Sequence, residues 1–303
     1  MKFFTLVISV LLAMPALAQT TALPVRQSIQ VPWEFRQAHT ESWKPTKVPV
    51  SVHTALLQNG MIDDPYYRDN EEKLQWIERE DWEFQCVFDV DSAVLQHKHV
   101  ELVFKSLDTY AHVYLNDSLL LETDNMFRTW KADAKHLLKP KGNRLHVYFE
   151  SPLKKVEPDW KNLGYELPGG IRTMTRKAQF HYGWDWGPRF VGCGILKAPE
   201  ILAWNDLIIE NIYVTTQKLT KENARMVARF RYRSDIAAPV TIFTQIGKSK
   251  SVEDRKLRIG VHEDSVTWDV PEPRLWWCNG MGEPFLYDFS VSIKQNVAAI
   301  ERA

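Results

Sequence analysis

The stretch "HYGWDWGPRF", residues 181–190, places one carboxylate between two indoles. In a regular strand, Asp185 would face away from Trp184 and Trp186, because neighbouring side chains point to opposite faces. Gly183 and Gly187 permit unusual backbone angles, and in a glycine-bounded loop all three side chains could converge on one pocket. A carboxylate that accepts from two sugar hydroxyls beside an apolar wall suits carbohydrate recognition. The alternative is a buried aspartate that caps backbone amides in a tight loop, and the residues alone weigh both equally.

A second candidate region is the acid-rich segment 63–84, "DDPYYRDNEEKLQWIEREDWEF". It holds so many acids that paired carboxylates can be chosen almost at will, so a solvated surface is the favoured interpretation. Trp76 and Trp82 amid this charge indicate packing under or beside a neighbouring domain. Arg68 and Asp69 could pair as a loop brace.

Two further segments are rich in aromatic residues. The loop "NMFRTW", residues 125–130, has an apolar tip of the kind that docks on another surface. Packing within its own sandwich is the slightly favoured alternative. The segment "RLWWCNGMGEPFLY", residues 274–287, contains turn signals at its glycines. It is interpreted as a structural lid at the end of a sandwich rather than as a catalytic site.

The sequence lacks the common catalytic motifs. It contains no GxSxG, Walker loop, HExxH or GxGxxG pattern and no strong nucleophile–base pair. Its cysteines, Cys86, Cys193 and Cys278, are far apart and have no histidine at ligand spacing, which argues against zinc. We therefore expect no metal and no cofactor. The odd cysteine count leaves at least one thiol unpaired or bonded to another chain, and buried free thiols are the favoured interpretation.

The composition limits the kinds of partner. The 303 residues include 38 basic and 38 acidic side chains, so nothing favours a phosphate backbone and we expect no nucleic-acid partner. Twelve tryptophans are unusual for this length. Tryptophan excess in a polar β protein suggests sugar binding, although core packing is the favoured role for any single tryptophan.

The N-terminus has the pattern of a secretory signal peptide. Lys2 precedes an apolar run at 3–14, and Ala16-Leu17-Ala18 forms a small-residue cleavage site. We expect residues 1–18 to be removed before Gln19 and the mature chain to be exported, either to the periplasm or to the medium. No later segment is long and apolar enough for a transmembrane helix, so we expect no membrane partner.

Most of the chain alternates in hydrophobicity with the period of a β-strand. Phe84, Cys86 and Phe88 share one face of such a segment, and Asn116-Asp117-Ser118 marks a hairpin turn. Helices are expected at 54–60 and 70–80. The predicted strand segments are 83–90, 99–107, the hairpin 111–122, 142–152, 208–217, 223–234, 238–247, 264–270 and 284–293.

Short strands at this spacing predict an all-β chain of two antiparallel sandwiches. The second set of strands has about the length of an immunoglobulin-like domain, and the boundary is placed near 203–207. The predicted domains are therefore 19–204 and 205–303.

At this point several stretches resemble a known family. The sequences "SVHTALLQNGMIDDPYYRDNE", "LQWIEREDWEF", "LDTYAHVYLND", "DNMFRTW", "RKAQFHYGWDWGPRFVGCGI" and "LWWCNGMGEP" occur in this order between about residues 49 and 293. Together they resemble the N-terminal part of β-mannosidases of glycoside hydrolase family 2. The "GWDWGP" element is specific to the mannosidase branch of that family.

The resemblance implies a fold and a division of labour. The fold is a galactose-binding-like jelly roll followed by an immunoglobulin-like β-sandwich, with a catalytic TIM barrel C-terminal to both. The implied substrates are β-mannosides, hydrolysed at a terminal mannose with retention by two barrel glutamates. By the same resemblance, Asp185 binds mannose hydroxyls, Trp184 and Trp186 wall the subsite, and Arg176 braces the loop.

The sequence departs from the family pattern in two ways. It ends before the barrel, so no catalytic residue is expected within it and the chain is expected to be inactive alone. Cys278 stands where relatives usually have proline. Two alternatives remain open: a free-standing carbohydrate-binding module, or a scaffold whose exposed Trp76, Trp82 and Phe127 dock on a separately encoded barrel.

Overall fold

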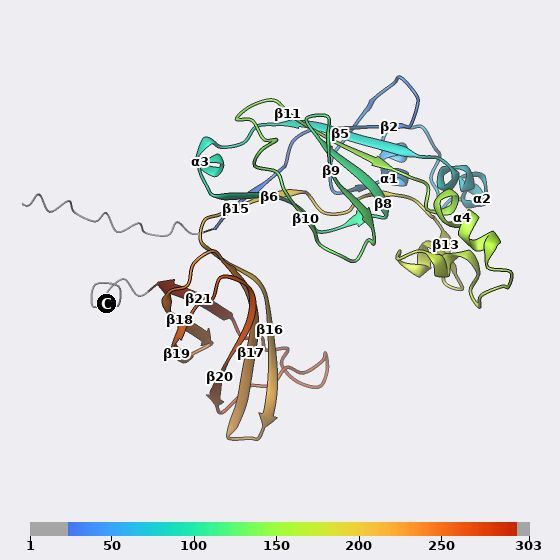
Figure 1. The fold of residues 1–303 in the computed structure, drawn as a ribbon. Helices are drawn as coiled ribbons and strands as arrows, with labels where there is room; N and C mark the ends of the chain where they lie inside the picture. Colours follow the sequence, from blue (N-terminus) through green and yellow to red (C-terminus); the bar gives the residue numbers. More distant parts are fainter. Residues whose placement is uncertain (1–23, 296–303) are drawn as a thin grey trace, which may run out of the picture. The chain divides into compact units, whose positions relative to one another are not determined.

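The computed structural model describes residues 24–295, so the predicted signal peptide lies outside the described residues. The chain forms two compact units, divided between Asn205 and Asp206 (Figure 1). No helix in the described part of the chain is both long enough and apolar enough to cross a membrane.

The first unit is built from two main antiparallel sheets and one smaller, three-stranded sheet. The six-stranded sheet has the order β3 (Lys44–Thr46), β2 (Trp33–Gln37), β5 (Trp82–Phe88), β11 (Asn143–Phe149), β8 (Tyr110–Leu115), β9 (Ser118–Asp124). The four-stranded sheet has the order β1 (Val25–Ser28), β15 (Glu200–Trp204), β6 (His99–Phe104), β10 (Trp130–Asp133). The small sheet has the order β4 (Val50–Ser51), β14 (Gly194–Ile195), β7 (Leu107–Asp108).

Alternating side chains form the core between the main sheets. Phe84, Cys86 and Phe88 are all buried, as their shared face predicted. Phe149 packs edge-on against Phe84 with ring centroids 5.7 Å apart. Burying one such ring is worth about 1.5–3 kcal/mol, so this interior supplies much of the stability of the unit.

The hairpin predicted at 111–122 is formed by β8 and β9. Asn116 and Asp117 have φ angles of 50° and 70°. Positive φ at both central residues produces a turn whose twist matches that of the strands, and Asn and Asp tolerate it well. This prediction is confirmed.

The helices of the first unit are short and lie at its periphery (Figure 1). They are α1 (Val52–Gln58), α2 (Asn70–Lys73), η1 (Gln75–Arg79), α3 (Ser92–Leu95), α4 (Pro152–Asn162), η2 (Gly170–Met174) and η3 (Gln179–His181). The helix expected at 54–60 begins earlier, because Ser51 accepts a hydrogen bond from the Thr54 amide and caps the first turn.

The single helix expected at 70–80 is instead an α-helical turn followed by a 3₁₀ segment. The 3₁₀ geometry places residues three apart on one side, which buries Leu74 and Ile77 and leaves Trp76 exposed. Trp82 is buried in the core of its own unit rather than beside a neighbouring domain. The proposed Arg68–Asp69 brace is wrong.

Asp69 pairs with Lys73 instead, at 2.9 Å, because residues four apart face each other on a helix.

The second unit is a sandwich of two three-stranded sheets around its own core. One sheet has the order β16 (Leu207–Leu219), β17 (Asn223–Ser234), β20 (Gly260–Pro271), and the other has the order β19 (Ser249–Lys256), β18 (Pro239–Ile246), β21 (Phe289–Gln295). The sequence did not predict β19, since none of its residues is buried and it shows no apolar alternation.

The aromatic loops and the cysteines only partly follow expectation. Phe127 is exposed rather than packed within its sandwich. Trp276 and Trp277, in the segment 274–287 that was interpreted as a structural lid, are also exposed. Cys86 and Cys193 are buried free thiols as expected, whereas Cys278 is free and exposed.

Candidate functional site

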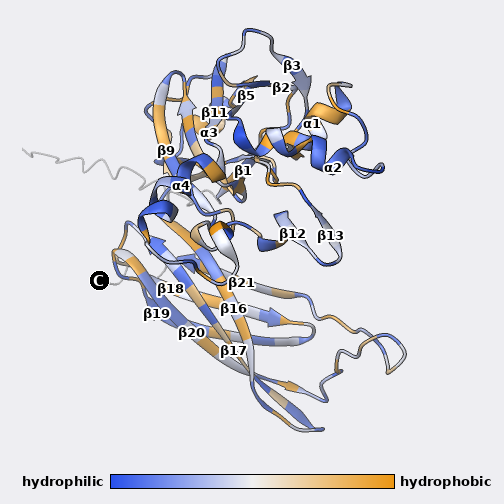
Figure 2. Cartoon of the chain, turned by 90° about the vertical axis from the view of Figure 1, so that its right-hand side faces the viewer, coloured by the Kyte–Doolittle hydropathy of each residue, from blue (hydrophilic) through white to orange (hydrophobic). Residues whose placement is uncertain are grey.

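The residues 181–190 form a β-hairpin separate from the main sheets. β12 (Tyr182–Trp184) pairs with β13 (Gly187–Arg189), and Asp185 and Trp186 are the two turn residues (Figure 2). Gly183 has a φ of 89°, and a Cβ there would lie 3.3 Å from the Arg189 Cβ. Gly183 is therefore required by both the backbone angle and the close approach of the partner strand.

The hairpin tip presents its side chains to solvent. Trp184 is 48% exposed and Trp186 is 73% exposed. Asp185 is exposed, and within residues 24–295 its carboxylate has no hydrogen-bond or ion-pair partner. This excludes the interpretation of Asp185 as a buried cap of backbone amides. The two indoles also have different neighbours within the first unit: Arg172 lies over Trp184 at 5.0 Å, and Phe180 lies 6.3 Å from Trp186.

The base of the hairpin is anchored by Arg189. Its Nε and Nη2 donate to the two carboxylate oxygens of Glu78 at 3.0 and 2.9 Å. Nε also donates to Gln75, and Nη1 donates to the Tyr182 carbonyl. Bidentate guanidinium–carboxylate pairs fix geometry as well as adding energy. Arg189 therefore holds β13 against η1, which fixes the point from which the tip projects.

The brace assigned to Arg176 is wrong. Its side chain pairs with Asp124 at 3.5 Å, and both side chains are more than half exposed. Its backbone carbonyl accepts from the Met126 amide, so Arg176 supports the loop 125–130 instead. Sequence reasoning missed Arg189 and Glu78 because nothing local identifies a pair separated by 111 positions.

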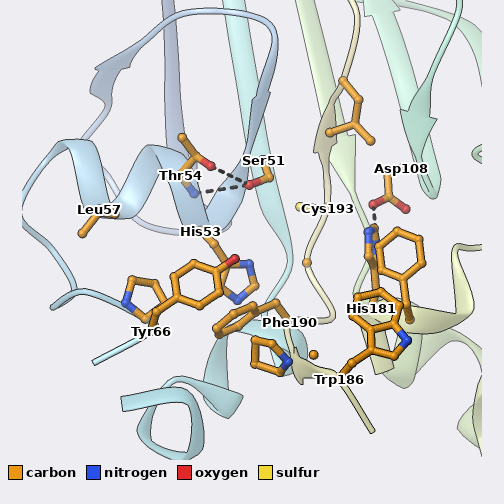
Figure 3. A pocket seen from close by; sticks show the side chains of 16 residues that line it. Ser51, His53, Thr54, Leu57, Tyr66, Asp108, His181, Trp186, Phe190 and Cys193 are labelled. Carbon is orange, nitrogen blue, oxygen red and sulfur yellow. Dashed lines mark hydrogen bonds and ion pairs between the residues drawn. The ribbon is translucent and has the colours of Figure 1, made fainter. Parts of the chain in front are cut away.

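A pocket of about 430 Å³ lies beside the hairpin (Figure 3). Its walls are mainly rings: Phe190 contacts His53 and Tyr66, with centroids 5.2 and 5.5 Å apart. Trp186 and Phe180 contribute the hairpin side of the pocket. An apolar hollow with a few polar groups is the usual form of a small-molecule site.

A buried ion pair lies beneath this pocket. Lys177 Nζ is 2.5 Å from Asp108 Oδ2, and the two side chains are 0% and 4% exposed. Lys177 also donates to the Gly192 carbonyl at 2.7 Å. His181 Nδ1 lies 3.6 Å from the same carboxylate oxygen, as the dashed line in Figure 3 marks. Both buried charges are thus compensated, which is the condition for keeping them away from water.

The two imidazoles of the pocket are kept neutral. Burial lowers the pKa of His53 to about 4, and the Lys177 ammonium acts in the same direction, as does His181 when it is protonated. Burial and Lys177 also lower the pKa of His181, although Asp108 opposes this. A neutral imidazole can both donate and accept a hydrogen bond, which suits a polyhydroxylated ligand.

Asp108 is the one carboxylate among the lining residues that the structure describes, and it is occupied by Lys177. Hydrolysis of a glycosidic bond requires two carboxyl groups on either side of that bond. Among residues 24–295, no group of three or more His, Cys, Asp or Glu is arranged to hold a metal ion.

Two family models match the chain in succession. The model described as glycosyl hydrolase 2 galactose-binding domain-like matches residues 33–197. The model described as glycosyl hydrolases family 2 matches residues 208–303. Together with the structure, these matches confirm the predicted all-β fold, a galactose-binding-like sandwich followed by an immunoglobulin-like sandwich.

Curated proteins and a solved structure are similar to the chain over most of its length. Beta-mannosidase B of Aspergillus terreus is 31% identical over 298 residues, covering 91% of this chain and 34% of that protein. Beta-mannosidase B of Emericella nidulans is 32% identical over 287 residues, covering 87% of this chain and 32% of that protein. The crystal structure of β-D-mannosidase from Dictyoglomus thermophilum matches with a TM-score of 0.82 and 33% identity, covering 89% of this chain and 34% of that one. The chain thus spans about a third of the length of the relatives it matches.

Proposed function

The chain belongs to glycosyl hydrolase family 2, and from that premise we propose that it forms the non-catalytic N-terminal part of a retaining exo-β-mannosidase. Its substrates are then β-mannosides with a terminal, non-reducing β-D-mannose. The similarity to β-mannosidases over about nine-tenths of the chain supports this assignment. A catalytic barrel, C-terminal to these two domains, supplies the two glutamates in this proposal.

The observation that carries the proposal is the hairpin tip. Asp185 is exposed and unpaired within the described residues, and it stands between two exposed indoles. An aspartate with free acceptor oxygens can accept from two neighbouring sugar hydroxyls, and an indole face can pack on the C–H groups of a pyranose. We assign Asp185 as the ligand of the mannose hydroxyls and Trp184 and Trp186 as the walls.

The hairpin then contributes binding and orientation rather than bond breaking. A retaining hydrolase uses a nucleophile and an acid/base carboxyl about 5–5.5 Å apart. Asp185 holds the terminal sugar in register with those groups, while the Arg189–Glu78 pair keeps the tip in place. Such positioning raises the rate because the reacting atoms are held close to their reactive geometry.

Substitution of Asp185 in the full-length enzyme containing these domains tests the assignment. For Asp185→Ala we expect kcat/KM on 4-nitrophenyl β-D-mannopyranoside to fall about 100-fold or more, because two charge-assisted hydrogen bonds to the sugar are lost. The matched control is Glu41→Ala, an exposed acid in a loop away from the hairpin in the sequence, which should leave kcat/KM unchanged. An unchanged kcat/KM for Asp185→Ala would remove the ligand assignment.

We also propose that the protein is exported. The support is the charged, apolar and small-residue pattern of residues 1–18. Mass spectrometry of the protein recovered outside the cytoplasm should give an N-terminus at Gln19. Recovery only from the cytoplasm, with Met1 retained, would contradict export.

A further inference from the structure

The outer face of the six-stranded sheet carries a row of rings and charges. On β8, Tyr110, His112 and Tyr114 point outward, because the residues between them are buried in the core. On β11, His146 and Tyr148 do the same. This face is therefore neither apolar nor simply charged, and its side chains are half-buried against one another.

The register of the strands brings these rings into contact. His146 pairs with Tyr114 across the sheet, and their rings stack with centroids 5.6 Å apart. Tyr148 pairs with His112, with centroids 6.1 Å apart. Trp43 stands edge-on to His146 at 6.3 Å. The result is a ring-lined surface that runs along two central strands.

Three hollows lie along this surface and share lining residues. The first, of about 240 Å³, is lined by Tyr114, His146 and Tyr148. The second, of about 450 Å³, shares Tyr148 with the first. The third, of about 400 Å³, shares Glu150 and Lys155 with the second. We call these three adjoining hollows, which extend from Tyr114 to Lys155, the sheet trough.

Most charges in the trough are paired, whereas Arg128 lies over the Trp130 ring at 4.6 Å and has no carboxylate partner among residues 24–295. Glu150 lies 2.8 Å from Lys155 and 2.5 Å from His112 Nε2. Asp81 lies 3.1 Å from Lys154 and accepts a hydrogen bond from the Tyr148 hydroxyl at 2.8 Å. A ligand rich in hydroxyl groups can share the remaining lone pairs and N–H groups of these pairs without breaking them.

We propose that the sheet trough binds a linear oligosaccharide, as a site separate from the hairpin. Sugar rings expose both C–H faces, which pack on tyrosine and imidazole rings, and hydroxyls, which suit paired carboxylates and ammonium groups. Hollows in series fit consecutive sugar units of one chain. The residues lining the trough share no member with the pocket beside Trp186.

The choice of mannose as the sugar rests on the proposed function. The proposal that the trough binds an oligosaccharide rests on its lining residues and not on that function. The experiment therefore measures binding of β-1,4-linked mannohexaose and of cellohexaose to this chain by isothermal titration calorimetry. Because the assay needs no hydrolysis, its result is independent of the Asp185 substitution in the full-length enzyme. Binding of cellohexaose alone would support the trough while separating it from the mannosidase assignment.

Two variants test whether the sugar binds in the trough. Tyr114→Ala removes a stacking ring, and Lys155→Ala removes a donor that borders two hollows. We expect Tyr114→Ala to weaken binding about tenfold and Lys155→Ala to weaken it several-fold. Since Lys155 is exposed and leaves the core intact, it keeps the test valid if Tyr114→Ala fails to fold. Tyr213→Ala, an exposed ring on β16, is the control and should bind like the parent chain.

Each result of the calorimetry either supports or overturns the proposed site. Binding of either hexasaccharide that at least one folded trough variant weakens, while Tyr213→Ala leaves it unchanged, supports the site. Absence of binding of both sugars at millimolar concentration overturns the proposal. Binding that neither Tyr114→Ala nor Lys155→Ala weakens also overturns it, since the sugar would then bind elsewhere.

Discussion

Arg189 and Glu78 show how a single pair positions the hairpin. The Glu78 side chain is 9% exposed and accepts both hydrogen bonds of the guanidinium fork. Hydrogen bonds to charged groups contribute about 1.5–3 kcal/mol when partly buried, and removing one partner leaves the other unsatisfied. The pair therefore contributes to stability as well as to the geometry of the tip.

For Glu78→Gln we expect the free energy of unfolding of the first unit to fall by about 1.5–3 kcal/mol, because the amide cannot accept both guanidinium bonds. Urea unfolding followed by tryptophan fluorescence measures this change. The control Asp69→Asn disrupts an exposed ion pair with Lys73, and its effect on the free energy of unfolding should be much smaller, because solvent screens such a pair. Equal effects of both substitutions would show that the Arg189–Glu78 pair is not an anchor.

His53 makes the stability of the first unit depend on pH. Its pKa is about 4 in the folded chain and 6.5 in the unfolded chain. Between these values the unfolded state binds more protons, so stability falls as the pH is lowered from 6.5 towards 4. Because the lowered pKa values of His146 and His181 act in the same direction, His53 accounts for part of the slope.

His53→Phe should reduce this loss of stability in acid, because phenylalanine keeps a ring against Phe190 and cannot bind a proton. The measurement is the urea midpoint at a pH above 6.5 and at a pH near 4, for parent and variant. An unchanged difference between the two midpoints would rule out His53 as a contributor.

At the scale of elements, the small sheet that joins β4, β14 and β7 is packed too closely for a side chain at Gly194. A Cβ at Gly194 would lie 2.8 Å from the Ser51 Cα and closer still to the Val50 carbonyl oxygen. Backbone atoms on a neighbouring strand cannot move aside as the end of a long side chain can. This sheet lies next to the pocket, since its residues Ser51 and Asp108 line the pocket wall.

Gly194→Ala should therefore destabilise the first unit by about 2 kcal/mol or more, as overpacking does in close-packed interiors. Gly187→Ala is the matched control, because a Cβ there meets no atom within 4 Å and its φ is not positive. Thermal denaturation followed by circular dichroism compares the two. A midpoint for Gly194→Ala equal to that of Gly187→Ala would contradict the predicted clash.

Local signals predicted several elements and failed on others for physical reasons. The hairpin at Asn116-Asp117 was predictable because its turn chemistry is confined to adjacent residues. β19 was not, because a strand with no buried face leaves no apolar alternation. The segment Trp184–Trp186 could be selected as a candidate from composition alone. Its anchor at Glu78 could not, because ion pairs across 111 positions depend on the fold.

At the scale of the whole molecule, each of the two units that the structure describes has a main core of its own. The core of the first unit includes Phe35 and Phe149, whereas that of the second includes Phe230 and Trp268. The fold class of both units was predictable because the family resemblance extends through each of them. Each unit has a hydrophobic interior of its own, which is what independent folding requires.

We expect two unfolding transitions in differential scanning calorimetry of the chain, one for each unit. Glu78→Gln should lower the midpoint of one transition and leave the other unchanged, because Glu78 lies in the first unit only. A single transition that shifts as a whole with Glu78→Gln would show that the units unfold together.

The exposure of Cys278 has a practical consequence for chemical modification. Cys86 and Cys193 are buried, and burial raises the pKa of both thiols, so the reactive thiolate form is suppressed. A thiol-reactive dye added to the native chain should attach at Cys278 alone, on the second unit. Once the first unit unfolds, Cys86 and Cys193 also become reactive. The average number of dyes bound per chain therefore measures the fraction of chains whose first unit has unfolded.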